Sequence, residues 1–93
     1  MVYLISYDLH ENKDYDSLTA AIESYPAHCH ILESVWIIGT KNELNAVYKK
    51  LLRVIDDDDN LIVAEMVNYA GQLSAKHWPR IEKIFKAYCG DQR

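Results

Sequence analysis

The sequence predicts an α/β protein built as a two-layer sandwich, and three observations carry this prediction. An apolar run rich in β-branched residues opens the chain at residues 2–8, as expected of a buried central strand. Segments with apolar residues at three- and four-residue spacing then alternate with short apolar runs, which indicates helices between strands. The chain has 93 residues, 49% hydrophobic and 26% charged, and this suits one globular domain over residues 1–93.

The first strand is predicted at residues 2–8 and ends on Asp8. A carboxylate at the exit of a strand is held in place yet reaches water, so Asp8 can serve as a metal ligand or a base. It can equally start the polar turn that we expect at residues 10–14. The position alone leaves both interpretations open.

The first helix is predicted at residues 14–25, where apolar side chains recur on one helical face. This face carries Tyr15, Leu18, Ala21, Ile22 and Tyr25. Asp14 or Asp16 can cap its first turn. Pro26 ends the helix, because a proline disfavours helical geometry in the residue before it.

A second strand is predicted at residues 31–39, with side chains alternating between the two faces of the sheet. Leu32, Ser34, Trp36 and Ile38 would share one face, and Ile31, Glu33, Val35 and Ile37 the other. The run His28-Cys29-His30 precedes it. Imidazole and thiolate bind zinc, but no second ligand pair follows at ligand spacing, so we expect a solvated loop.

The second helix is predicted to open with a capping box of Thr40 and Glu43 and to continue to about Ile55. Its apolar positions are Leu44, Val47, Tyr48, Leu51, Leu52 and Ile55. The acidic run at residues 56–59 ends it. This run lacks the alternating spacing and the distal glutamate of a calcium-binding loop, so we expect a solvated loop there. A third strand is predicted at residues 61–67.

The last part of the chain is predicted to form a C-terminal helical extension at residues 76–89. For residues 69–73 the sequence leaves two predictions open, a short strand or an irregular segment that crosses the sheet. Pro79 suits the first turn of the helix. The predicted order is βαβ-αβ followed by a helix, which fits a ferredoxin-like two-layer α/β sandwich with right-handed crossovers.

Charge is unevenly distributed along the chain, whose net charge is −4. Residues 76–93 carry five bases against two acids, a net +3, and residues 1–75 carry five bases against twelve acids, a net −7. The acidic bulk argues against nonspecific coating of nucleic acid. Lys76, Arg80 and Lys83 are therefore the candidate phosphate contacts, although bases in a last helix also complement its dipole.

Four further residues have a functional and a structural interpretation. Trp36 and Trp78 can stack on bases as in single-strand binders, but we expect both to be buried in the core or in a dimer. Cys29 and Cys89 are too few for a disulfide scaffold and suit small buried hydrophobes.

Because no apolar run is long enough to span a bilayer and no signal-peptide pattern opens the chain, we expect a cytoplasmic protein without membrane contact.

Several stretches together resemble the Cas2-like family of CRISPR-associated proteins, which share a ferredoxin-like fold with the VapD endoribonucleases. They are residues 3–9, 13–15, 32–38, 55–56 and 59–63. The likeness extends over about residues 1–67 and is strongest to a standalone branch, rather than to members of the adaptation module.

The resemblance implies a homodimer whose two sheets meet, with Asp8 at the family's metal-binding aspartate. Some members are credited with magnesium-dependent cleavage of RNA or DNA, and others act only as a scaffold for DNA and a partner integrase. Family nucleases place arginines shortly after this aspartate, where this chain has His10 and the polar residues 11–14.

Two functional hypotheses follow. The first is a homodimer that binds RNA or DNA and is a Mg²⁺-dependent endonuclease, with Asp8 as both catalytic residue and metal ligand. The second is a noncatalytic dimeric module or scaffold that binds another protein, in phage defence or in a toxin–antitoxin pair. The aspartate favours the first, and the acidity favours the second.

Overall fold

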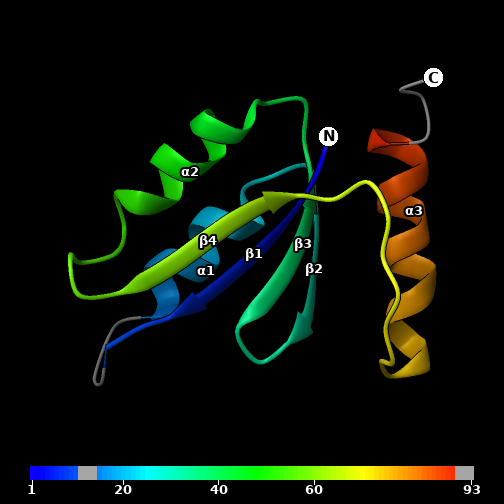
Figure 1. Ribbon diagram of the computed structural model, residues 1–93, viewed down its shortest axis with the longest axis horizontal. Coiled ribbons are helices and arrows are strands. Elements are labelled where there is room, and N and C mark those ends of the chain that lie inside the picture. The colour runs from blue at the N-terminus through cyan, green and yellow to red at the C-terminus, as the bar shows by residue number, and fades with distance from the viewer. Residues whose placement is uncertain (11–14, 90–93) are drawn as a thin grey trace.

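The computed structural model describes residues 1–10 and 15–89, which form one four-stranded antiparallel sheet with helices (Figure 1). The strands are β1 (Val2–Asp8), β2 (Ala27–Leu32), β3 (Val35–Gly39) and β4 (Asn60–Glu65), in the spatial order β2-β3-β1-β4. Helices α1 (Tyr15–Glu23) and α2 (Leu44–Leu52) connect β1 to β2 and β3 to β4. This βαββαβ order confirms the predicted ferredoxin-like sandwich.

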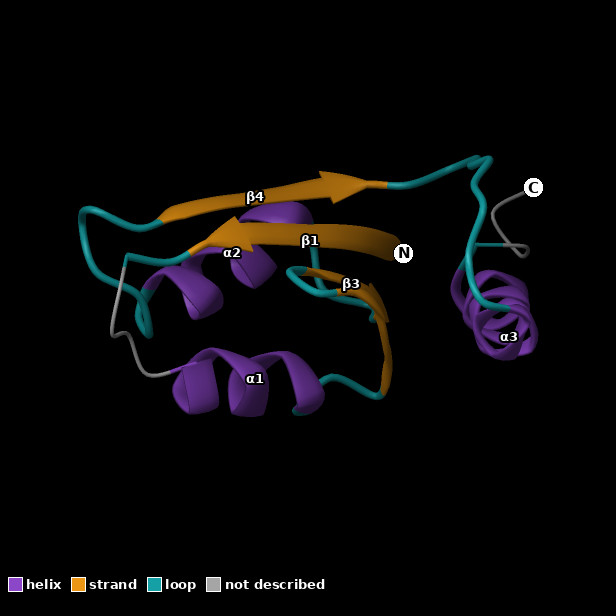
Figure 2. Cartoon of the chain, turned by 90° about the horizontal axis from the view of Figure 1, so that it is seen from below, coloured by secondary structure: helices purple, strands orange, loops and turns teal. Residues whose placement is uncertain are grey.

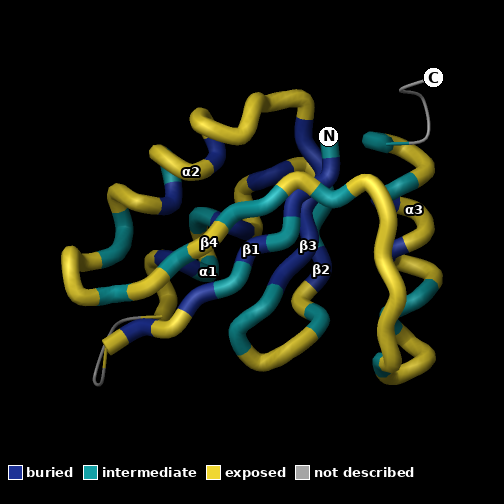
Figure 3. Tube along the Cα trace, viewed as in Figure 1, coloured by how far each residue is buried: buried dark blue, intermediate teal, exposed yellow. Residues whose placement is uncertain are grey.

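Helices α1 and α2 lie together on one face of the sheet (Figure 2). Alternate residues of β1 point toward them, because successive side chains of a strand face opposite ways. Tyr3, Ile5 and Tyr7 are buried there with Trp36 and Ile38 of β3. Leu18, Ile22, Val47 and Leu51 close this core from the helices. The predicted apolar faces of both helices are thus buried only in part, because Tyr15, Leu44, Tyr48 and Leu52 on these faces are exposed. Figure 3 traces the buried positions along the chain.

The opposite face of the sheet is covered only in part. A 3-10 turn at Ala75–His77 leads into α3 (Trp78–Tyr88), which has Pro79 in its first turn as predicted. Five buried residues form a second core between α3 and the sheet: Val2, Cys29, Ile37, Ile81 and Ile84. Helix α3 contacts β3, β2 and the first residues of β1, so the rest of this face remains open beside β1 and β4 (Figure 2).

Residues 31–39 do not form one strand, which corrects the prediction. The chain turns at Glu33 and Ser34, and the two halves pair as the hairpin β2–β3. The amide of Tyr7 donates to the carbonyl of Ser34 over 3.1 Å, which fixes this turn beside β1. Leu32 and Val35 are apolar on either side of the turn, so the apolar pattern continues across it. The pattern alone therefore does not indicate a hairpin.

The run His28-Cys29-His30 lies in β2 and not in a solvated loop, which is a second correction. Cys29 is buried against α3, as expected for a small hydrophobe, whereas Cys89 is half-buried. The sequence concealed this edge strand because its two imidazoles break the apolar pattern.

The start and end of α2 also differ from the prediction. Thr40 does not cap the helix; its Oγ1 accepts a hydrogen bond from the amide of Asn42, and Glu43 occupies the cap position without a side-chain hydrogen bond. The helix begins at Leu44, later than a cap at Thr40 implies, and it ends at Leu52 rather than at Ile55. The capping box fails because the Thr40 hydroxyl is engaged locally before the helix starts.

The remaining boundaries shift by a few residues. Strand β4 ends at Glu65, two residues before the predicted end, and residues 69–73 contain no strand. Helix α1 begins at Tyr15, which puts Asp16 inside its first turn and not at the cap. The alternative cap Asp14, and most of the predicted turn at residues 10–14, lie outside the described residues.

Candidate functional site at the end of strand β1

Asp8 is exposed at the last position of β1, as the sequence predicts. Tyr7 points into the core beneath α1 and α2, so Asp8 points to the opposite face, which it shares with Ser6. Its cross-strand partner is Asn60, the first residue of β4. Together with Ser6 and Ile62 they line an open hollow of about 260 Å³.

The donors in this hollow are oxygen atoms, the ligand type that Mg²⁺ prefers. The Cβ atoms of directly opposed residues on neighbouring strands lie about 5 Å apart on one face, so Asn60 can extend its amide toward the hollow that Asp8 lines. Mg²⁺ commonly takes one or two carboxylates and keeps several waters, and this donor set fits that habit. Asn60 was not a candidate from sequence, because only the β1–β4 register brings it to Asp8.

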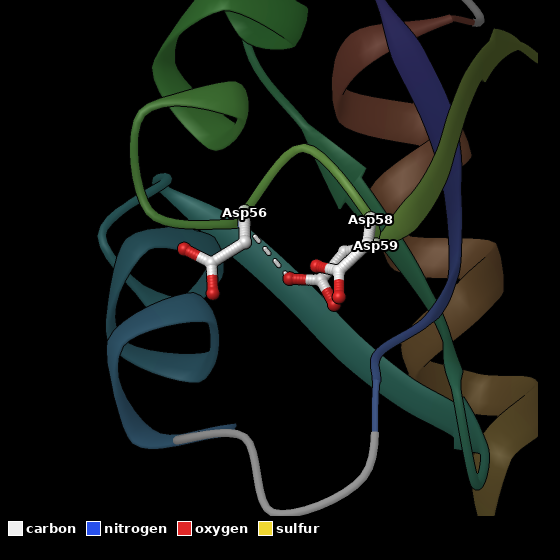
Figure 4. A group of neighbouring side chains, drawn as sticks. All are labelled: Asp56, Asp58 and Asp59. Atoms are coloured by element: carbon white, nitrogen blue, oxygen red, sulfur yellow. Dashed lines mark hydrogen bonds between the residues drawn. The ribbon is translucent and has the colours of Figure 1, made fainter.

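Three carboxylates of the loop before β4 gather near this end of the sheet (Figure 4). One oxygen atom from each of Asp56, Asp58 and Asp59 lies within 4.8 Å of the others. Both oxygens of Asp59 accept backbone hydrogen bonds, from the amide of His10 over 2.7 Å and from that of Asp56 over 2.8 Å. The His10 ring also lies 3.6 Å from Asp58.

These contacts give the acidic loop a structural role. Asp59 ties the loop to the chain that leaves β1, and it is half-buried while Asp56, Asp57 and Asp58 are exposed as predicted. Among residues 1–10 and 15–89, Asp8 belongs to no such three-ligand cluster. The loop nevertheless adds negative charge to the corner that holds Asp8.

The predicted basic residues lie elsewhere and are not all together. Arg80 and Lys83 line a hollow of about 440 Å³ between α3 and the start of β2. The Arg80 guanidinium also donates to the carbonyl of His28 over 2.9 Å, which covers part of the exposed edge of β2. Lys76 lies in the 3-10 turn and is not part of this hollow.

Asp8 and the basic residues therefore occupy separate surfaces. The hollow at Asp8 and the hollow at Arg80 share no lining residue. Helix α3 contacts β1 through Val2, at the opposite end of the strand from Asp8. Within one chain, the acidic and basic candidates do not form a single site.

The histidines of β2 do not form a zinc site with Cys29. Their alternation directs Cys29 toward α3, and it directs His28 and His30 to the opposite face, where both rings contact Trp36. The His30 ring stacks on Trp36 with centroids 4.3 Å apart. A thiolate and two imidazoles on opposite faces of one strand cannot bind the same ion.

The two tryptophans are placed differently. Trp36 is 4% exposed and donates its indole N–H to the Tyr7 hydroxyl over 3.2 Å, so its predicted burial in the core is confirmed. Trp78 is half-buried and stacks with Tyr69 at a centroid distance of 6.1 Å. Its packing against the second core agrees in part with the expected burial.

These observations define a ferredoxin-like protein with an exposed aspartate at the end of its first strand. A family model described as CRISPR associated protein Cas2 matches residues 1–72, well over half of the chain, and the chain belongs to this family. The matched range ends before the 3-10 turn and α3, so Lys76, Arg80 and Lys83 lie beyond it.

A solved structure gives independent support for the fold. A hypothetical protein, TT1823, from Thermus thermophilus is similar with a TM-score of 0.63 and 19% identity; the alignment covers 80% of this chain and 90% of that one. No curated protein sequence matches the chain significantly. In the described part of the chain, every helix is too short or too polar to cross a membrane.

Proposed function

We propose that this protein is a homodimer that binds nucleic acid and cleaves phosphodiesters with Mg²⁺ held at Asp8. One observation carries the proposal: the exposed Asp8 carboxylate stands on the part of the sheet face that α3 leaves uncovered, in a member of the Cas2 family. A second copy packed on this face would bring a second Asp8 toward the first.

The open face has the composition of an interface. Apart from Ser6, its side chains between α3 and Asp8 are apolar, and they come from three neighbouring strands: Leu4 of β1, Val35 of β3, and Ile62 and Ala64 of β4. Ile62 is 60% exposed in one chain. Removing such side chains from water is worth about 25 cal/mol per Å² of apolar surface, which favours association of two copies.

Bound Mg²⁺ would polarise a phosphate and activate water. The chain's own residues hold the reactants: Asp8 and Asn60 supply oxygen ligands, and Arg80 and Lys83 attract the phosphate backbone. Neither base lines the hollow at Asp8, so the backbone contacts act at a distance from the cleavage site.

A second function is favoured by the charge around Asp8. The carboxylates of Asp58 and Asp59 lie in the same corner, and they repel an approaching phosphodiester. A noncatalytic scaffold that binds another protein would tolerate this charge. Such a dimer is our alternative proposal.

The nuclease proposal is tested by incubating the pure protein with labelled RNA and DNA, with Mg²⁺, Mn²⁺ or EDTA. Asp8→Asn keeps the shape and removes the charge, and we expect it to lower cleavage at least about 100-fold, because losing a residue that only hydrogen-bonds a metal ligand already costs about 10–100-fold. Asp57→Asn is the matched control in the exposed loop and should cleave normally. Cleavage that survives Asp8→Asn would assign the activity to another site or to a contaminant.

The dimer is tested by sedimentation velocity. Ile62→Lys places a charge in the centre of the open face and should shift the protein to monomer. Leu52→Lys introduces the same charge at an exposed leucine of α2, away from that face, and should leave the dimer intact. A dimer that is unaffected by Ile62→Lys would show that another surface mediates association.

A further inference from the structure

A second hollow adjoins the basic hollow at Arg80. It has a volume of about 300 Å³ and lies where the end of α1, the residues after β3 and helix α2 meet. The two hollows share Pro26 and Tyr88 as lining residues. They therefore adjoin, and together they extend from α3 past the end of β3 toward α2.

The charged side chains that line the two hollows are all of one sign. Arg80 and Lys83 line the first hollow, Lys41 and Lys50 line the second, and no carboxylate lines either one. Acids outnumber bases by 14 to 10 in the chain, so the positive charge of the two hollows is opposite in sign to the net charge of the chain. Within the described residues, none of the four bases forms an ion pair.

One of these lysines is held in place without an acidic partner. The Lys50 ammonium lies 4.5 Å from the centre of the Tyr25 ring and donates to the Ser24 hydroxyl. A cation over an aromatic face is attracted by the ring quadrupole, which positions the charge but does not neutralise it. This hydrogen bond uses one of the three N–H donors of the ammonium, and the others can bind an anion.

Tyr88 lies at the junction of the two hollows. Its ring is half-buried and packs against the backbone of Gly39. An aromatic ring between two cationic hollows matches the pattern by which single-stranded nucleic acids are bound, with bases stacked on aromatic rings and phosphates held by lysine and arginine. A paired base in a duplex cannot stack in this way.

We propose that Lys41 and Lys50 form a second phosphate-binding hollow, which continues the surface of Arg80 and Lys83 into one path for single-stranded nucleic acid across Tyr88. The path rests on the nucleic-acid binding proposed above, but it requires neither Asp8 nor cleavage. Its residues come from four segments of the chain, and no motif connects them.

The test is fluorescence anisotropy of a short labelled single strand, in EDTA and over a range of salt concentrations. The double variant Lys41→Gln with Lys50→Gln should bind more weakly. Its plot of log K against log salt should be shallower by about 1.4, because each lost phosphate contact on a single strand contributes about 0.7. The control Lys49→Gln with Lys86→Gln removes the same charge from exposed lysines outside both hollows and should keep the slope of the wild type.

The single variant Lys41→Gln shows whether weaker binding could result from misfolding. We expect it to fold normally, because the Lys41 side chain has no hydrogen bond or ion pair within the described residues. It should lower the slope by about 0.7. The proposed path would be overturned if the control variant of Lys49 and Lys86 lost as much affinity and slope as the Lys41 and Lys50 variant. An unchanged slope in the Lys41 and Lys50 variants would also overturn it. Duplex that binds as tightly as single strand would contradict the role of Tyr88.

The outcomes also separate this inference from the proposed nuclease. Loss of binding in the Lys41 and Lys50 variants of a protein that never cleaves would support the path and reject the nuclease. Cleavage that depends on Asp8, together with binding that is unchanged when both lysines are replaced, would support the nuclease and reject the path. A wild-type protein that binds no nucleic acid would overturn both.

Discussion

The ring of Tyr88 in α3 lies directly against the backbone of Gly39 at the end of β3. A Cβ atom at position 39 would stand no more than 2.9 Å from three carbon atoms of that ring, closer than real Cβ contacts allow. Helix α3 can approach the sheet at this point only because residue 39 has no side chain. The contact joins the C-terminal helix to the part of the chain that defines the family.

We predict that Gly39→Ala weakens the attachment of α3. Inserting a methyl group into this contact should cost about 1–3 kcal/mol of the free energy of unfolding, the range for overpacking, and should speed proteolysis within α3. Urea denaturation measures the loss. Gly71→Ala is the control, because its Cβ would lie 3.8 Å from Trp78 in ordinary contact. Equal stability of Gly39→Ala and the wild type would mean that Tyr88 moves aside freely.

Asp59 should contribute more to stability than its neighbour Asp57. Asp59→Ala removes the acceptor of two backbone amides, at His10 and Asp56, and we expect a loss of about 1 kcal/mol because each exposed hydrogen bond contributes modestly. Asp57 is exposed, and Asp57→Ala should change the free energy of unfolding little. Thermal or urea unfolding of the two variants, measured side by side, decides this. Indistinguishable variants would remove the structural role given to the loop.

Tyr25 carries a buried hydroxyl that has no hydrogen-bond partner among the described residues. Because an unsatisfied buried polar group is unfavourable, Tyr25→Phe should raise the free energy of unfolding at neutral pH by about 1 kcal/mol. The ring beneath Lys50 is kept in this variant. A destabilised Tyr25→Phe protein would indicate that the hydroxyl has a partner in solution.

Alkaline pH should destabilise the fold through buried tyrosines. Burial raises the pKa of Tyr25, and burial with the charges of Glu65 and Glu43 raises the pKa of Tyr3. Their stabilising contribution is complete below the unfolded pKa of about 10. It is lost as the pH rises from there through the folded pKa, because the unfolded chain releases these protons first. Urea denaturation from pH 8 to 11 should show this decline, and it should be smaller in Tyr25→Phe. A flat profile would contradict it.

The two cysteines should react with thiol reagents at different rates. Cys29 is fully buried, and burial raises the pKa of its thiol, opposed only in part by Arg80. Because the thiolate is the reactive form, Cys29 should be labelled only as fast as the contact between α3 and the sheet opens. Half-buried Cys89 should react first. Mass spectrometry after timed labelling measures both rates, and Gly39→Ala should accelerate the labelling of Cys29 more than that of Cys89. Rapid labelling of Cys29 in the wild type would show that α3 detaches readily.

The sequence predicted the elements whose periodicity is strong. Strand β1, the two helices of the core and α3 all appear near their expected places, because their apolar positions repeat at the period of the structure they form. The hairpin β2–β3 was missed because a turn of two residues, Glu33 and Ser34, interrupts a run whose flanks are equally apolar. A local pattern does not report which strands pair.

The candidate site likewise combines a residue that the sequence identified with residues that only the structure brought to it. Asp8 was identified from its place at the end of a strand and from a family resemblance. Its neighbour Asn60 and the acidic corner depend on the register of β1 with β4, which sequence spacing does not encode. Lys41 and Lys50 had no sequence signal, because Lys41 lies in a short polar stretch and Lys50 lies on a helix surface beside Lys49.

By itself, the sequence determined the ferredoxin-like class, the family and the position of Asp8, because burial periodicity and short motifs are local properties of the chain. Only the tertiary structure decided which charged groups meet. Strand pairing brought Asn60 to Asp8, and the packing of α3 on Gly39 set Arg80 and Lys83 beside the hollow of Lys41 and Lys50. Electrostatic potential depends on distance in space, and residues far apart in sequence acquire their distances only when the chain folds.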